Sequence, residues 1–216
     1  MPMTPGTYWV YKGSVRWYDF EHHRPTTKTV SIKMTVQKVI DRPDFTAVVI
    51  SGFPGDLDWS EGEWSAAPWL LIETNRHQVF LEGLDLDVDV SKLESDSTSF
   101  QKYMTEDSLI FQWPLKKGQK FCDAESKQRP DDRYCWVIAT HSQKNLGAVK
   151  GIRAQLRDVF LLQNVTNPDD TQMELSPGIG FVSYQYHHHG SIADTRMSLV
   201  EFHPVAGPSP KNGVKP

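Results

Sequence analysis

Alternation of apolar and polar residues with a period of two is the feature that most constrains the fold of this chain. From Val30 to Val36 every second residue is apolar and the residues between are polar. Successive side chains of a strand point to opposite faces, so this pattern predicts a strand with one buried face. Residues 7–20, rich in Tyr, Trp and Val, precede it across a polar connection at residues 21–27. We therefore predict that these two strands pair antiparallel.

Further runs of strand character recur along the chain. They lie at residues 45–53, 69–73, 78–81, 109–113, 119–122, 134–138, 181–188 and 197–203. Residues 145–165 fit either helix or strand, and we favour strand because the neighbouring segments are strands. The sequence thus predicts an all-β fold, a curved antiparallel meander of roughly ten strands that forms an open barrel or half-barrel.

The domain prediction is a single β domain over residues 1–204, since 216 residues fit one core. Two long loop insertions interrupt the strands, at about residues 52–68 and 82–107, and we expect them to lie over one end of the sheet. The second is acidic and serine-rich, with a short helix predicted around residues 100–104, and is a candidate lid. Residues 205–216, rich in Pro, Gly and Lys, are predicted to be a disordered tail.

Charge disfavours a nucleic-acid-binding protein, and hydropathy disfavours a helix that spans a membrane. The net charge is -4, with 23 basic and 27 acidic residues and no basic stripe, so nucleic-acid binding is disfavoured. No apolar run reaches the roughly 18 to 20 residues of a spanning helix. The first residues lack the charged and apolar regions of a secretory leader, so either the protein stays inside or its leader has been removed.

Two cysteines favour the second alternative. Cys122 and Cys135 stand in strand-like runs on either side of a polar, turn-rich stretch, the arrangement of a hairpin closed by a disulfide. Such a bond is worth on the order of 3 kcal/mol and indicates an oxidising compartment. The alternative is two unrelated buried thiols, and a catalytic thiol is disfavoured because neither cysteine opens a helix. We therefore expect an extracytoplasmic protein, in the periplasm or cell envelope, whose leader is absent from this sequence.

Three consecutive histidines close the predicted strand at residues 181–188. Alternation places His187 and His189 on one face, where they could bind a divalent metal, with His22, His23, His141 or His203 as a third ligand only if the fold brings one close. The alternative is a polar hairpin end that binds no metal and needs no cofactor.

Other motifs of known function are incomplete or absent in this sequence. Asp85 to Asp89 resembles the start of a calcium loop, but Val90 occupies the glycine position and Asp96 the position of the final glutamate, so an EF-hand is rejected, although a looser calcium site stays open. We find no nucleophile elbow, no P-loop and no zinc-protease motif, and assign no catalytic residue. An enzyme is disfavoured but not excluded; a glycan-acting one would need two facing carboxylates about 5 to 9 Å apart.

Aromatic residues give the remaining functional hint. The chain has 7 Trp, 7 Tyr and 10 Phe. In strands such rings mostly fill the interior, which is our interpretation of Trp9, Trp17 and Trp136. Trp59 and Trp64 lie in the irregular segment and Trp69 at its end, where ligand-contacting residues concentrate. We predict Trp59, Trp64 and Trp69 as contacts for a ligand.

Three short segments, at residues 6–11, 113–118 and 176–184, resemble segments of uncharacterised bacterial cell-envelope proteins and lipoproteins built from meandering antiparallel sheet. The resemblance rests on turns rather than catalytic residues and covers the chain thinly from end to end. It implies a curved sheet with an exposed concave face, an export signal and no activity to carry over. Membrane proximity, through a removed leader or a lipid anchor, follows from the same resemblance.

Three functions of different class remain. The first is a non-enzymatic extracytoplasmic protein that binds a hydrophobic or amphiphilic small ligand, or a protein partner, on the concave face. The second is a metal-binding protein that uses His187 and His189. The third is a structural or assembly protein of the cell envelope, for which the sheet edges would matter.

Overall fold

The computed structural model of the protein describes residues 2–61, 63–64, 66–84, 99–189 and 193–206. Within these ranges the chain forms twelve strands and three short 3-10 helices. The strands are β1 (Tyr8–Asp19), β2 (Arg24–Asp41), β3 (Phe45–Ser51), β4 (Pro68–Thr74), β5 (Gln78–Gly83), β6 (Leu109–Gln112), β7 (Lys120–Cys122), β8 (Cys135–Asn145), β9 (Leu156–Val165), β10 (Asp169–Ser176), β11 (Gly180–His188) and β12 (Ala193–His203). The helices are η1 (Pro54–Leu57), η2 (Ser99–Tyr103) and η3 (Ser126–Gln128). None of the helices in these ranges has the length and apolar character needed to cross a membrane.

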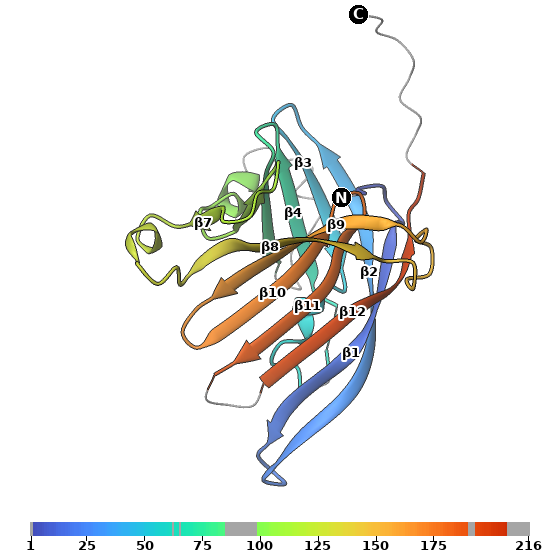
Figure 1. The fold of residues 1–216 in the computed structure, drawn as a ribbon, viewed down its shortest axis with the longest axis vertical. Helices are drawn as coiled ribbons and strands as arrows, with labels where there is room; N and C mark the ends of the chain where they lie inside the picture. Colours follow the sequence, from blue (N-terminus) through green and yellow to red (C-terminus); the bar gives the residue numbers. More distant parts are fainter. Residues whose placement is uncertain (1, 62, 65, 85–98, 190–192, 207–216) are drawn as a thin grey trace, which may run out of the picture.

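All twelve strands belong to one antiparallel sheet. Its order is β6-β5-β4-β3-β2-β1-β12-β11-β10-β9-β8-β7. The sheet curls into a nearly closed barrel, and its edge strands β6 and β7 come together at one seam that no ladder of the described residues seals (Figure 1). The predicted all-β fold and antiparallel meander are confirmed, and the sheet closes further than a half-barrel.

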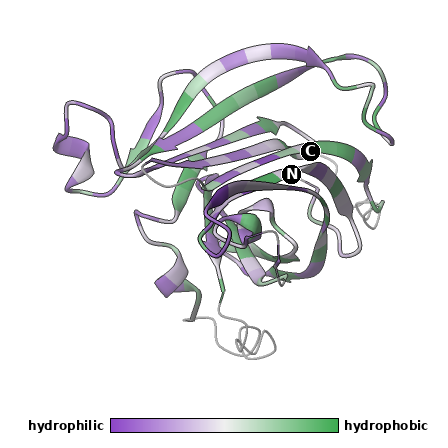
Figure 2. Cartoon of the chain, turned by 90° about the horizontal axis from the view of Figure 1, so that it is seen from below, coloured by the Kyte–Doolittle hydropathy of each residue, from purple (hydrophilic) through white to green (hydrophobic). Residues whose placement is uncertain are grey.

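The period-two pattern predicted the first hairpin correctly. β1 pairs antiparallel with β2, with Trp9 opposite Met34. The apolar residues of β2 that alternate from Val30 to Val36 are buried, and Ser31 and Lys33 between them are exposed. The same alternation of hydrophobic and hydrophilic residues colours most strands in Figure 2. One face of the sheet therefore points into the barrel and the other points outward.

The sequence prediction differs from the structure in two places. β10 was not among the predicted strands, because its run of polar residues hides the apolar positions Met173 and Leu175. Of residues 145–165, Asn145 ends β8 and only Leu156–Val165 forms a further strand, β9. Before it the chain turns, and Gly151 has a φ of +89°, with the Phe202 carbonyl oxygen 2.0 Å from where a Cβ would stand. Only glycine fits that approach.

Two hydrophobic clusters hold the sheet. The larger lies inside the barrel and includes residues from strands all round it. The smaller lies outside, where Phe100 of η2 packs on outward-facing residues of β3 and β4, among them Val49 and Leu70. The short helix predicted around residues 100–104 therefore has a counterpart in η2. Residues 85–98 and 207–216, which include part of the predicted acidic loop and most of the predicted tail, lie outside the described residues.

The barrel interior is densely packed near the start of β1. Trp9 and Tyr11 are both fully buried there. The Trp9 indole Nε1 donates a hydrogen bond to the Ile179 carbonyl oxygen at 2.7 Å, and the Tyr11 hydroxyl donates one to the Phe181 carbonyl oxygen at 2.8 Å. Burial raises the pKa of Tyr11 far above its ordinary value, so this side chain stays neutral. We call this half of the barrel the N-terminal half.

Candidate functional site

The other end of the barrel is covered by the loop that connects β3 to β4, of which residues 52–61, 63–64 and 66–67 are described (Figure 1). The loop leaves β3 at Gly52, whose φ is +72° and where a Cβ would stand 2.4 Å from the Lys33 carbonyl oxygen. Only glycine allows this close passage over β2. The loop then forms η1, in which Pro54 and Leu57 are buried. We call this end of the barrel the loop end.

Two aspartates of the loop bind aromatic side chains of the barrel interior. Asp56 Oδ1 accepts a hydrogen bond from the Trp69 indole Nε1 at 2.7 Å. Asp58 Oδ2 accepts one from the Tyr184 hydroxyl. The second oxygen of each carboxyl, Asp56 Oδ2 and Asp58 Oδ1, is buried and has no hydrogen-bond partner among the described residues. Two carboxyl groups are thus held in the barrel with half of their acceptor capacity unused.

Burial changes the acidity of both aspartates. It raises the pKa of Asp58 to about 7, against the opposing effect of Tyr184, and that of Asp56 to about 6, against the opposing effects of Trp69 and the Ala67 backbone N–H. The Thr195 hydroxyl lies close enough to lower the pKa of Asp58 but outside hydrogen-bonding geometry. Asp58 therefore changes charge near neutral pH, unlike an ordinary surface aspartate.

A third carboxylate, that of Asp169, contacts side chains of β11 at the loop end of the barrel. Asp169, at the start of β10, accepts a hydrogen bond from the Tyr186 hydroxyl at 2.7 Å and lies 2.6 Å from the His188 Nδ1. The Trp59 ring packs edge-on against His188, with 4.3 Å between the ring centroids, and against Tyr186 at 6.1 Å. The loop is therefore fixed to β11 through both Asp58 and Trp59.

Inside the barrel, next to these groups, lies a pocket of about 200 Å³ that we call the lumen pocket. Four aromatic side chains line it: Phe53, Trp69, Trp136 and Tyr184. Leu81, Ile110 and Met173 add apolar surface, and Thr171 and Asp107 are its polar groups. The lining comes from strands on both sides of the seam. A mostly apolar pocket with a few polar groups is typical of a small-molecule site.

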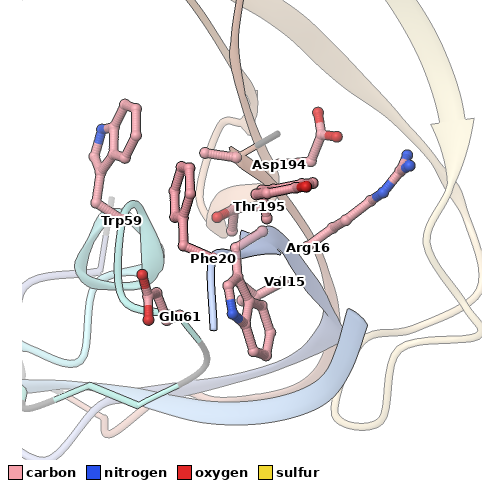
Figure 3. A pocket seen from close by; sticks show the side chains of 10 residues that line it. Val15, Arg16, Phe20, Trp59, Glu61, Asp194 and Thr195 are labelled. Atoms are coloured by element: carbon pink, nitrogen blue, oxygen red, sulfur yellow. The ribbon is translucent and has the colours of Figure 1, made fainter. Parts of the chain in front are cut away.

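A second pocket, of about 130 Å³, opens at the loop end beside Trp59, and we call it the mouth pocket (Figure 3). Phe20 is 72% exposed and Trp59 57% exposed, although both are large hydrophobic residues. Figure 3 shows their rings on one side of the pocket, with Arg16 and Asp194 on the other. The mouth pocket thus combines an apolar rim with charges of both signs.

The three predicted tryptophans occupy different places. Trp69 lines the lumen pocket and Trp59 the mouth pocket. Trp64 is partly buried and packs against the interior cluster. The structure therefore places Trp59 and Trp69 at pockets, and a ligand contact by any of the three stays a prediction.

Of the predicted metal ligands, His187 lies on the outer face of β11 and His189 follows the end of that strand. The rings of His187 and His189 are adjacent, with centroids 4.8 Å apart, and His187 contacts Asp194 across the sheet. His188 contacts Asp169 and the Trp59 ring instead. Over the described ranges, no group of three or more His, Cys, Asp or Glu side chains is placed to hold a metal ion. Metal binding by His187 and His189 stays a prediction, and the suggested calcium loop lies outside the described residues.

The predicted disulfide is present. Cys122 on β7 and Cys135 on β8 are joined, with a Cα–Cα distance of 4.4 Å, and they stand directly opposite each other in the β7–β8 ladder. The bond ties β7, one edge of the seam, to its neighbour.

Sequence reasoning missed Asp56, Asp58 and Tyr184. The two aspartates look like ordinary loop acids, and Tyr184 is 126 residues away from Asp58 in the chain. Their one local signal is that Asp56 and Asp58 flank the apolar Leu57, which is fully buried. Trp136, interpreted as an interior residue, does point inward, but it lines the lumen pocket.

Comparisons with known proteins give no family. No protein-family model matches the chain, and no curated protein matches it. Among solved structures, a presumed exported protein with a YmcC-like fold from Bacteroides fragilis NCTC 9343 superposes with a TM-score of 0.41 and 9% sequence identity, over 94% of this chain and 98% of that one. We draw no functional conclusion from a likeness at this level.

Proposed function

We propose that the protein is a non-enzymatic binding protein that holds the apolar part of a hydrophobic or amphiphilic ligand in the lumen pocket. The observation that carries this proposal is the contrast within one barrel: the N-terminal half is filled by Trp9 and Tyr11, whereas the loop-end half keeps about 200 Å³ of aromatic-lined space. Tight packing is the rule in protein interiors, so space of this size needs an explanation.

The chemistry of the lining favours an apolar ligand body. Trp69, Trp136 and Met173 offer broad, weakly polar surfaces, and each methylene that leaves water for such a pocket contributes about 0.8 kcal/mol. The exposed rings of Phe20 and Trp59 at the mouth pocket add apolar surface at the loop end of the barrel. Both features suit a chain or ring system that is poorly soluble in water.

Isothermal titration calorimetry with decyl maltoside, kept below its micelle concentration, tests this function. Thr171→Phe would place a ring in the lumen pocket, and we expect it to weaken binding at least tenfold. Thr29→Phe, at an exposed position of β2, is the matched control and should bind like the unmodified protein. Absence of binding by the unmodified protein, or equal binding by Thr171→Phe, would contradict the proposal.

We also propose that the protein works outside the cytoplasm, in the periplasm or cell envelope. The disulfide between Cys122 and Cys135 supports this location, because such bonds persist in oxidising compartments. Alkylation of whole host cells with a maleimide, before lysis and without reductant, tests it. We expect both cysteines to stay unlabelled, and labelling of both in the native host would reject the proposed location.

A further inference from the structure

We propose that the lumen pocket selects ligands that carry a cationic group, an amine or a quaternary ammonium, on their apolar body. This inference rests on the proposed function and names the class of ligand. It is carried by three features of the pocket: the arrangement of its aromatic rings, the hydrogen bonds that two of these rings make, and the sign of the charges around them.

The aromatic lining is suited to a cation. The faces of Trp, Tyr and Phe rings carry a negative partial charge, and they attract an ammonium group within about 6 Å of the ring centre. Phe53 packs against both Trp69 and Tyr184, with centroid distances of 4.7 and 5.6 Å, so three of the four rings form one connected wall. Trp136 lines the same pocket from β8. An ammonium group in this pocket would therefore meet several rings.

Two of these rings donate hydrogen bonds to carboxyl groups. The Trp69 indole N–H donates to Asp56 and the Tyr184 hydroxyl donates to Asp58. Donation to a negative acceptor polarises the donor and moves electron density toward the ring. The attraction of each ring for a cation should therefore exceed that of the same ring bonded to a neutral carbonyl oxygen.

The charges around the lumen pocket have one sign. Asp107 lines it, Asp56 and Asp58 lie behind Trp69 and Tyr184, and none of its lining residues is a lysine or an arginine. Lys120 and Lys127, which are close to the seam, line a separate groove on the outside and pair with Asp132 and Glu106. A ligand anion would thus meet only repulsion, whereas a cation would supply the missing counter-charge.

The buried aspartates point to the same conclusion. Asp56 Oδ2 and Asp58 Oδ1 have no partner among the described residues, and burial raises the pKa of both groups because the structure gives their charges too little compensation. The titratable groups that act on Asp58 are Tyr184 and Tyr186 on β11, Asp169 on β10 and Asp56, and His188 lies 2.6 Å from Asp169. The charges that act on Asp58 itself, those of Asp169 and Asp56, are acidic and raise its pKa. A cation bound nearby would favour the ionised aspartates and would release protons.

The test compares three ligands with one decyl chain at pH 8: decyltrimethylammonium, decyl maltoside and decanoate, each below its micelle concentration. We expect calorimetry to give a dissociation constant for the cation at least tenfold below that for decyl maltoside, with decanoate the weakest. Asp58→Asn and Asp56→Asn keep an acceptor for Tyr184 and Trp69 but remove the charge. Each should weaken cation binding about tenfold and change decyl maltoside binding several-fold less than cation binding.

The control is Asp44→Asn, at an exposed position between β2 and β3, which should change none of the three affinities. Lowering the pH from 8 to 5 should reduce the preference for the cation over decyl maltoside in the unmodified protein and not in the Asp56→Asn/Asp58→Asn double variant. Equal binding of the three ligands, or tighter binding of decanoate, would overturn the cation inference alone. If none of the three ligands binds, the proposed function falls with it.

Discussion

A tryptophan and a tyrosine point into the barrel in each of its halves, and their surroundings differ. In the N-terminal half, Trp9 and Tyr11 are fully buried and donate hydrogen bonds to backbone carbonyl oxygens. In the loop-end half, Trp69 and Tyr184 donate to the buried carboxyl groups of Asp56 and Asp58, beside a pocket. The first pair completes the hydrogen bonding of its neighbours, whereas the second pair leaves two carboxyl oxygens without a partner.

The two halves therefore differ in what they contribute, one to the stability of the fold and the other to ligand binding. Side chains that fill space and satisfy backbone groups stabilise the barrel. Buried carboxyl groups with raised pKa values oppose folding at neutral pH, and such groups cluster at functional sites. The N-terminal half therefore accounts for the stability of the barrel, and the loop-end half is the place where a ligand would contribute most.

The largest expected effect is that of Trp9→Ala. Removing this fully buried ring should lower the free energy of unfolding by about 3–5 kcal/mol, as measured by urea denaturation. Trp69→Ala should cost clearly less, because Trp69 is partly exposed to an existing pocket, but it should weaken decyl maltoside binding. Equal losses of stability in the two variants would remove the distinction between the halves.

Loss of the disulfide should have the next largest effect on the free energy of unfolding. Cys122 and Cys135 are 13 residues apart, and opening a loop of this length should lower the free energy of unfolding by about 3 kcal/mol. The Cys122→Ser/Cys135→Ser variant should still bind decyl maltoside, since neither cysteine lines the lumen pocket. A loss of binding in the folded variant would show that the seam edge, and not only the loop end, shapes the site.

Asp58→Asn should make the protein more stable at pH 8. An unfolded aspartate ionises near pH 3.8 and Asp58 in the barrel near pH 7, so the unfolded chain gives up this proton first as the pH rises. The free energy of unfolding therefore falls as the pH rises from about 4 to about 7. From pH 5 to pH 8 the unmodified protein should lose about 2–3 kcal/mol relative to Asp58→Asn in urea denaturation. Parallel pH profiles would show that this carboxyl is not buried as described.

The smallest expected effects on the free energy of unfolding are those of Tyr11→Phe and Tyr184→Phe. Tyr11→Phe should cost about 1 kcal/mol at every pH, because it leaves the buried Phe181 carbonyl oxygen without this donor. Tyr184→Phe should cost more at pH 8 than at pH 5, because the hydrogen bond that it removes from Asp58 is stronger where that group is ionised. Urea denaturation at both pH values measures the difference, and the same pH response in both variants would contradict it.

The sequence predicted those parts of the fold that depend on local patterns. Alternation identified β2, and the paired cysteines identified the disulfide between β7 and β8. It missed β10, whose inward positions carry Thr171 beside Met173 and Leu175 and so break the apolar period. Trp69 was predicted as a ligand contact from its place at the end of an irregular segment, and it does line a pocket.

The two buried aspartates could not be predicted in the same way. Asp56 and Asp58 are distinctive only because the loop folds back into the barrel, and their partners come from β4 and β11. Burial and the partners that raise or lower a pKa are properties of the closed sheet, and no local period encodes them. For the same reason the sequence could suggest which tryptophans meet a ligand but not the charge of that ligand.

We propose that the loop-end half of the barrel interior is the binding site and that the N-terminal half is not. The indole N–H resonances of the 7 tryptophans in a proton–nitrogen NMR spectrum, assigned by single Trp→Phe variants, test it during titration with decyltrimethylammonium. We expect the signals of Trp69 and Trp136 to shift with saturation and the signal of Trp9 to stay in place. An equal shift of Trp9, or shifts confined to Trp59 at the mouth pocket, would contradict it.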